Sequence, residues 1–515
     1  MATGGAQYLL PDGLGVAAAN DALAARLEVD RGRPRSCKRT LYDTFDGRLH
    51  AAGMVLIHED GRLALVDGVV YAERAGIDQP APPERVLVSD LPAGRLRNLL
   101  LPMVDVRALI PIAQINSRLS PLRVLNKHAK TVVRVVVEEA AVAASVRSRI
   151  PLRPRLLVAP VRGYGKATAR LRRALEDELG LRAAAEPLHD EAVAAAGGLP
   201  GGAISKLEFA LRPEQRADSA AAQVLARLVS VIEANLPGTL ADVDSEFLHD
   251  LRVALRRSRS VQRQLAGVFP PEPLERFRGE LRWLQQVTGP SRDLDVYRLE
   301  FDRLRSDLPE GLAGDLEPVR RLLAERRRAE HAKMARTLQG ARTTALLADW
   351  SRFLDGLVDS PQGERPDAAR QIGDVAGERI RAVYGRMVKM GRAIDDSSPP
   401  EALHKLRKKG KELRYLLELF GGLYPDEVVK PMLKTLKSLQ DTLGRFQDRE
   451  VQAQMLRSLR DEVADSDDGA AALMAMGLLV DRLEREQAAA RSEFAERFAA
   501  FRPKRQRALV ARTFG

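Results

Sequence analysis

Two stretches repeat one pattern and decide the fold: Phe247-Leu-His249-Asp-Leu-Arg252-Val-Ala-Leu-Arg256-Arg257-Ser-Arg259 and Ala402-Leu-His404-Lys-Leu-Arg407-Lys-Lys-Gly-Lys411-Glu-Leu-Arg414. The second stretch follows the first at a constant 155-residue offset, and the alignment continues without a gap over residues 249–297 and 404–452. Agreement between so many unlike residue types indicates a duplicated helical unit. Two such units packed together would be related by approximate two-fold symmetry.

A stripe of basic residues runs along each motif helix. The spacing i, i+3, i+7, i+10 and i+14 places residues on one helical face, and fourteen residues at the helical rise span about 21 Å. The face carries His249, Arg252, Arg256, Arg259 and Arg263 in the first copy, and His404, Arg407, Lys411 and Arg414 with the neighbouring Lys408 in the second. Like charges at these spacings destabilise a helix, so a bound polyanion or acids on other helices must compensate them. We predict that the stripes bind a polyanion; the alternative is a solvated helix face.

Further residues could add to this basic lining, and the histidines need a role of their own. The secondary lining residues are Arg257, Arg282, Lys434 and Lys437. Neither His249 nor His404 has an acidic residue at i+3 or i+4, so the sequence predicts no metal site there. We expect their imidazoles to donate hydrogen bonds to phosphate oxygens. No catalytic residue and no cofactor are predicted.

The segment from Ala217 onward is predicted to be helical throughout. Apolar residues recur at three- and four-residue spacing, and Pro and Gly punctuate segments that are long enough for antiparallel bundles. The repeated segments Gly289–Asp293 and Gly444–Asp448 are interpreted as helix ends, with Gly at the C′ position just past one helix and Asp as the N-cap of the next.

Residues 1–213 have a different pattern, typical of an α+β domain with an antiparallel sheet. Apolar runs around Asp60-Gly61 predict a hairpin within Met54–Val66. The other predicted strands are Ile110–Asn116, Thr131–Glu138, Arg155–Val161 and Lys206–Leu211, and residues 167–181 are predicted to be helical. We therefore expect two domains, residues 1–213 and 217–515.

Composition narrows the partners and the compartment. The chain has 82 Lys and Arg against 70 Asp and Glu, a net charge of +12, which favours a polyanionic partner. Aromatic residues are only 4% of the chain, too few for a protein that stacks single-stranded bases. A single cysteine, Cys37, excludes an internal disulfide framework and favours a reducing, cytoplasmic location. The sequence also predicts no membrane span and no signal peptide.

The paired His-x-x-Arg-x-x-x-(Arg/Lys)-x-x-Arg motifs resemble the CHAD family, the conserved histidine α-helical domains. The resemblance covers residues 217–515 and is especially close at Lys411-Glu-Leu-Arg-Tyr-Leu-Leu-Glu-Leu-Phe420. It implies two pseudo-symmetric four-helix bundles around a basic central channel that binds inorganic polyphosphate. It also implies association with polyphosphate granules and their proteins.

The N-terminal domain is similar to the CYTH domain, the triphosphate tunnel fold, at Leu41-Tyr-Asp-Thr-Phe-Asp-Gly-Arg-Leu49 and at Ser205-Lys-Leu207. That family's metal site needs Glu-x-Glu-x-Lys on the first strand, whereas this chain has Gly5-Ala-Gln-Tyr-Leu-Leu-Pro11 there. Paired carboxylates are what hold a divalent metal against a triphosphate. We therefore predict a degenerate, non-hydrolytic tunnel domain, in which Lys127, Lys130 and Arg134 could still bind phosphate.

The function predicted from the sequence is polyphosphate binding without catalysis, in the cytoplasm at polyphosphate granules and without a membrane partner. Polyphosphate offers dense charge and no base edges, so stripes of Arg and Lys suffice to bind it. Two alternatives remain open: a triphosphate-tunnel phosphohydrolase, and a nucleic-acid-binding protein, for which no recognisable motif is present.

Overall fold

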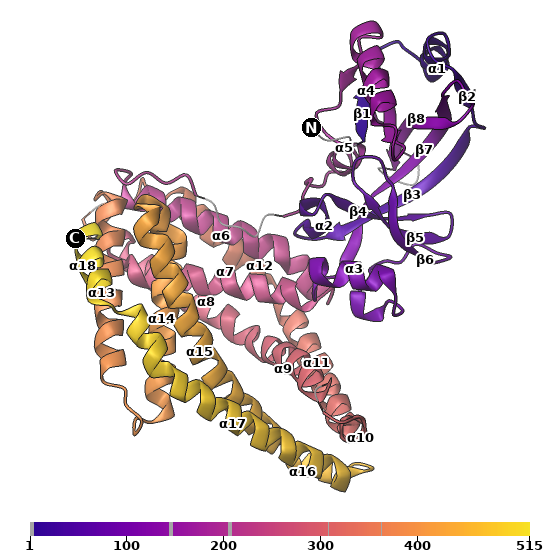
Figure 1. The fold of residues 1–515 in the computed structure, drawn as a ribbon. Coiled ribbons are helices and arrows are strands. Elements are labelled where there is room, and N and C mark those ends of the chain that lie inside the picture. Colours follow the sequence, from indigo (N-terminus) through magenta and orange to yellow (C-terminus); the bar gives the residue numbers. More distant parts are fainter. Residues whose placement is uncertain (1–4, 144–147, 204–208, 307, 362, 515) are drawn as a thin grey trace. The chain divides into compact units, whose positions relative to one another are not determined.

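The computed structural model describes residues 5–143, 148–203, 209–306, 308–361 and 363–514. Contacts divide the chain into two compact units, Met1–Ser205 and Lys206–Gly515. The first unit is a curled antiparallel sheet with short helices, and the second is all-helical (Figure 1). This agrees with the fold class predicted from the sequence.

The sheet of the first unit runs in the order β11-β1-β10-β8-β7-β3-β4-β5-β6, with β2 paired to β7 and β9 to β8, and its neighbouring strands are antiparallel. Its strands are β1 Ala6–Leu9, β2 Val29–Arg31, β3 Arg35–Thr44, β4 Met54–Glu59, β5 Arg62–Asp67, β6 Glu73–Asp78, β7 Leu109–Leu125, β8 Thr131–Ala143, β9 Arg149–Pro151, β10 Arg155–Pro160 and β11 Arg182–Ala183. Its α-helices are α1 Val16–Ala24, α2 Arg48–Ala51, α3 Arg95–Val104, α4 Gly165–Arg173 and α5 Leu188–Ala195.

The predicted hairpin is present as β4 and β5. Its two turn residues, Asp60 and Gly61, both have positive φ, 50° and 77°, as a tight two-residue turn requires. Three more predicted strands lie within β7, β8 and β10, and the predicted helical segment begins with α4. Part of the last predicted strand, residues 206–208, lies outside the described residues, and its described residues 209–211 form no strand.

The second unit repeats its helices at the same offset as the motif. The helices that begin at Ala217, Ser245 and Pro271 have counterparts that begin at Ile372, Pro400 and Asp426. The helices are α6 Ala217–Leu240, α7 Ser245–Gln264, α8 Pro271–Val287, α9 Gly289–Ser306, α10 Glu310–Asp315, α11 Glu317–Leu338, α12 Ala341–Asp355, α13 Ile372–Arg392, α14 Pro400–Phe420, α15 Asp426–Ser458, α16 Arg460–Ala464, α17 Gly469–Phe501 and α18 Lys504–Thr513. The duplication therefore extends well beyond residues 249–297 and 404–452.

A short antiparallel bridge joins the two repeats at equivalent positions. Arg216 pairs with Gln371, its counterpart at the offset of the repeat. A pair formed by two equivalent residues lies on the axis that relates the repeats, so this bridge marks the expected approximate two-fold symmetry.

The apolar faces of both repeats meet in one continuous core. It contains the buried leucines of α7, among them Leu248, Leu251 and Leu255, together with Leu403, Leu406 and Leu413 of α14. A second, smaller core joins the hairpin of α9 to α11 with α15 to α17, through residues such as Phe301 and Leu456. These elements form the two long projections of the helical unit in Figure 1.

The interpretation as a helix end is confirmed for Gly289, which directly follows Thr288, the C-cap of α8, but it is wrong for Asp293 as the next N-cap and for Gly444–Asp448. Gly444 and Asp448 lie inside α15, and Asp293 lies inside α9, which Gly289 begins. A Cβ built at Gly289 would be 3.7 Å from Nη1 of Arg252, and one at Gly444 would be 3.9 Å from Nη2 of Arg407. The glycines thus lie where the motif arginines reach the neighbouring helix.

Candidate functional site

The two motif helices, α7 and α14, contact each other in antiparallel orientation. Arg257 Nη2 donates to Glu418 Oε2 at 2.7 Å, and Arg263 Nη1 donates to Glu412 Oε1 at 3.2 Å. The residue number rises along one helix as it falls along the other, which defines the antiparallel direction. The predicted basic stripes therefore lie beside each other.

These two ion pairs are equivalent under the repeat. Arg257 corresponds to Glu412 and Arg263 to Glu418 at the offset of the repeat. Each pair is thus the symmetry mate of the other, but α7 contributes the cation and α14 the anion in both. Acids on another helix therefore compensate part of the repulsion along the first stripe.

Each motif histidine is held by the same position of the neighbouring helix. Nδ1 of His249 lies 2.8 Å from Nη2 of Arg292, and Nδ1 of His404 is hydrogen-bonded to Oε1 of Gln447. Arg292 and Gln447 are equivalent in the repeat. The histidines are therefore oriented by α9 and α15.

The first arginine of each motif docks on the helix that follows in its own repeat. Arg252 is buried and donates through Nη1 to the Gln285 carbonyl at 2.8 Å and to Thr288 Oγ1 at 2.9 Å. Burial lowers its pKa to about 10, with a further contribution from Arg256. Its counterpart Arg407 forms an ion pair of 2.9 Å with Asp448. Arg252 is thus an anchor within the protein rather than an outward-facing ligand, which differs from the predicted stripe.

Arg256 and Lys411, equivalent in the repeat, form the centre of the site. Neither makes a hydrogen bond or ion pair with any residue that the structure describes, although Nε of Arg256 is buried. Burial, together with the positive charges of Arg407 and Arg256, lowers the pKa of Lys411 to about 8, against the opposing effect of Asp448. Two repeats thus bring two half-buried cations together, and the acids Asp293 and Asp448 act on them only from beyond ion-pair distance.

Four arginines line a groove of about 290 Å³ at the C-terminal end of α7. Arg259 is hydrogen-bonded through Nη1 to Oε1 of Gln285, and burial lowers its pKa. The groove is lined by Arg259, Gln262, Arg263, Glu275, Arg278 and Arg282. At the equivalent positions of the second repeat, Arg278 is replaced by Leu433 and Arg263 by Glu418. The strongly basic groove therefore belongs to the first repeat.

The remaining predicted residues lie at the edges of the site. Arg414 donates to Glu418 at 2.6 Å. Lys408, Lys434 and Lys437 are exposed and, within the described part of the chain, make no hydrogen bond or ion pair. The structure thus separates the predicted set into paired anchors and unpaired cations.

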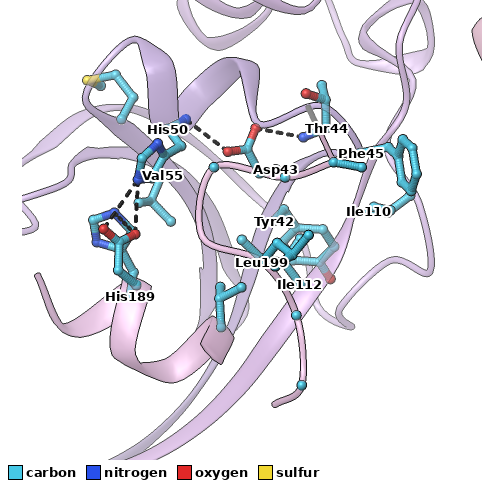
Figure 2. A pocket seen from close by; sticks show the side chains of 18 residues that line it. Tyr42, Asp43, Thr44, Phe45, His50, Val55, Ile110, Ile112, His189 and Leu199 are labelled. Atoms are coloured by element: carbon cyan, nitrogen blue, oxygen red, sulfur yellow. Dashed lines mark hydrogen bonds and ion pairs between the residues drawn. The ribbon is translucent and has the colours of Figure 1, made fainter. Parts of the chain in front are cut away.

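The first unit has its own cavity, of about 290 Å³, beside β3 and α5 (Figure 2). Asp43, from the Tyr-Asp-Thr segment, is buried and accepts backbone hydrogen bonds from Thr44, Leu49 and His50 at 2.6 to 2.8 Å, which fixes α2. Figure 2 shows His50 and His189 facing each other on one side of the cavity, with Phe45 and Ile110 on the other. No motif in the sequence pointed to this pair, because the two histidines lie far apart along the chain.

Charged residues inside the curled sheet are paired with one another. Arg39 forms a buried ion pair with Glu138, and Arg155 forms one with Glu191. Gln7 is the buried polar residue of β1 and accepts a hydrogen bond of 2.9 Å from Arg155. A neutral amide thus stands on the strand where a hydrolytic tunnel would carry metal-binding carboxylates. Of the cations predicted to bind phosphate in this unit, Lys127 lines a cleft of about 870 Å³ together with Arg26, Lys166 and Arg170.

Within the described residues, none of the helices combines the length and the apolar character that crossing a bilayer requires.

Comparison with known proteins identifies the helical unit. The CHAD domain family model matches residues 223–457, and these residues are a CHAD domain, a domain linked to polyphosphate binding. "Uncharacterized protein MT2285" of Mycobacterium tuberculosis (strain CDC 1551 / Oshkosh) and "Uncharacterized protein Rv2226" of strain ATCC 25618 / H37Rv are each 30% identical over 221 residues, 41% of this chain and 40% of the relative. The matched region thus spans less than half the length of these curated relatives.

Two solved structures are similar to part of this chain. The CHAD domain from the plant Ricinus communis is 24% identical, with a TM-score of 0.48 over 58% of this chain and 96% of that one. PptA from Streptomyces chartreusis is 19% identical, with a TM-score of 0.43 over 55% of this chain and 99% of that one. The curled sheet of the first unit is compatible with a CYTH-like tunnel.

Proposed function

We propose that this protein binds inorganic polyphosphate along the contact between α7 and α14, without catalysing a reaction on it. The proposal rests on Arg256 and Lys411, two half-buried cations that lack a partner among the described residues. Burying unpaired cations costs free energy. A bound anion would recover this cost, because phosphate oxygens accept the charge-assisted hydrogen bonds that both side chains can donate.

Around this centre, the polyanion would meet further cations in both directions. Arg259 and Arg282 continue the site into the groove of the first repeat, and Lys408, Lys434 and Lys437 offer exposed positive charge on the second. Arg252 and Arg407 keep the motif helices in place, and His249 and His404 border the site from oriented positions. A flexible chain of phosphates fits such a row of cations, because it carries about one negative charge per phosphate. Arginine and lysine side chains can bind these phosphates without recognising any base.

The proposal extends to the setting of the protein. Binding of long polyphosphate would place it in the cytoplasm at polyphosphate granules, with granule proteins as neighbours. Hydrolysis of triphosphate in the first unit is disfavoured, because Arg39 and Arg155 are already paired with carboxylates and Gln7 is neutral.

The proposal is tested by reversing the two central charges. In the double variant Arg256→Glu, Lys411→Glu, polyphosphate affinity should fall by at least about a hundredfold, and the slope of log Kd against log salt should decrease by about 2. Affinity is measured for long-chain polyphosphate, triphosphate and duplex DNA over a salt series, and release of phosphate from triphosphate with Mg²⁺ is followed in parallel.

The matched control is Arg328→Glu, Arg336→Glu. Both of these arginines are exposed on α11 and have no partner among the described residues, so the net charge changes equally. An equal loss of affinity in both double variants would mean that general basicity binds the polymer. Stronger binding of duplex DNA than of polyphosphate would favour the nucleic-acid alternative, and metal-dependent turnover would favour the hydrolase.

A further inference from the structure

Three potential metal ligands converge in the first unit. Oδ1 of Asp190 lies 3.1 Å from Nε2 of His50 and 3.3 Å from Nε2 of His189. One donor atom from each of these three residues lies within 4.8 Å of the other two. Two imidazoles and one carboxylate form a donor set that Zn²⁺ and related transition-metal ions accept.

The Asp190 carboxylate lies between the two histidines, and its Oδ2 is hydrogen-bonded to Nε2 of His50 at 3.3 Å. Oδ1 of Asp190 is buried and accepts no hydrogen bond from the described residues, although both imidazole nitrogens are close to it. With bonds of about 2.0 Å, neighbouring ligand atoms of a tetrahedral zinc ion are about 3.3 Å apart. The two separations around Oδ1 are close to this value, and all three donor atoms lie within 4.8 Å of one another, near enough for one cation to contact them together.

The ligands are held by the fold before any ion binds. His189 and Asp190 are adjacent in α5, and the side chain of His189 is only 8% exposed. The backbone N–H of His50 donates to buried Asp43 at 2.8 Å, which fixes the short helix α2. The rings of His50 and His189 have centroids 5.9 Å apart in an edge-to-face arrangement. Such preorganisation is what a metal site requires of its supporting residues.

We propose that His50, His189 and Asp190 form a binding site for a single divalent transition-metal ion of the Zn²⁺ type. The three residues line the cavity of Figure 2, so the fourth position of a tetrahedral ion would face that cavity and take water or an anionic oxygen. The site is independent of the CHAD domain. It also differs in kind from an all-carboxylate magnesium site, which needs hard oxygen ligands.

The test uses the full-length chain, freed of metal by dialysis against a chelator. Titration calorimetry with Zn²⁺ should give one site with a Kd below about 10 µM, and Co²⁺ should show the visible absorption of a four-coordinate ion. The variants His189→Ala and Asp190→Asn should each weaken binding by at least about a hundredfold, more than is typical for loss of a residue outside the ligand set.

The control is His128→Ala, an exposed histidine in the turn between β7 and β8, which should leave Zn²⁺ binding unchanged. His50→Ala provides a second test if the α5 variants fail to fold, because the His50 side chain is 36% exposed and tolerates truncation better. Zn²⁺ binding that is absent, or unchanged in His50→Ala, would overturn the proposal. Polyphosphate affinity should be the same in all these variants, so the two proposals can fail separately.

Discussion

The two motif helices occupy equivalent positions in the two repeats, but they carry opposite charges at the two positions where they contact each other. α7 carries Arg257 and Arg263 where α14 carries Glu412 and Glu418, and the two sets meet in symmetric ion pairs. Between them, Arg256 and Lys411 have kept the same sign of charge. The duplicated unit has therefore diverged at the positions that join the repeats and not at the centre of the site.

This difference in charge explains how two helices rich in basic residues can pack against each other. If α14 carried arginine at positions 412 and 418, as α7 does at the equivalent positions, six cations would lie along the contact. Their mutual repulsion would then destabilise both helices. With two glutamates on α14, the contact is attractive at these positions, while Arg256 and Lys411 form no ion pair with the described residues. We conclude that the glutamates stabilise the contact between repeats and concentrate the unpaired charge where a polyanion would bind.

Replacing the two contact glutamates of α14 by arginine, as found at the equivalent positions of α7, should have the largest effect on the free energy of unfolding. In the double variant Glu412→Arg, Glu418→Arg, the half-buried pair Arg257–Glu418 and the more exposed pair Arg263–Glu412 become repulsive contacts, and the free energy of unfolding should fall by about 2 kcal/mol. Urea unfolding measures it. Exchanging the charges by adding Arg257→Glu and Arg263→Glu should recover more than half of the loss. If the exchanged variant recovers nothing, pairwise attraction between the helices is not what joins them.

The second effect concerns the first arginine of each motif. Arg252→Ala should lower the free energy of unfolding by slightly less than about 2 kcal/mol, because it leaves the Gln285 carbonyl and Thr288 without their buried donor. Arg407→Ala should cost less, about 1 kcal/mol, since the Asp448 that it pairs with is half exposed and can be hydrated. Thermal unfolding of both variants in parallel checks the order, and an equal cost would contradict the assigned anchor role of Arg252.

The smallest predicted effect is a pH-dependent change in stability that is caused by Lys411. The pKa of Lys411 is about 8 in the folded chain against 10.5 when unperturbed, so the unfolded chain binds more protons between these values. Stability should therefore rise with pH through that window, and the penalty is complete below it. Lys411→Met should stabilise the protein by about 1 to 2 kcal/mol near pH 7 and by much less near pH 10. Urea unfolding at both pH values measures this, and a gain that does not depend on pH would refute the assignment.

Prediction from the sequence succeeded where the pattern is local or repeated. Helical spacing identified the apolar face of α7, and the Asp60-Gly61 turn identified the β4–β5 hairpin. It failed at Gly444–Asp448, which lie inside α15, because glycine and aspartate are typical of helix ends and also suit a close contact between helices. The approach of Arg407 to Gly444 shows that the second case applies there.

The sequence by itself determined the duplication, the helical class of the second unit and the residues that make it basic, because these follow from periodicity and from a constant offset along the chain. Tertiary structure alone decided which of the basic residues are paired. Arg252 and Arg256 are one helical turn apart on the same predicted stripe, yet the first is buried against α8 and the second has no partner among the described residues. The same holds for His50, His189 and Asp190, which come together only because α2 and α5 both pack against the sheet. The physical reason is that charge compensation and coordination depend on distances between helices and strands, and the spacing of residues within one helix does not contain those distances.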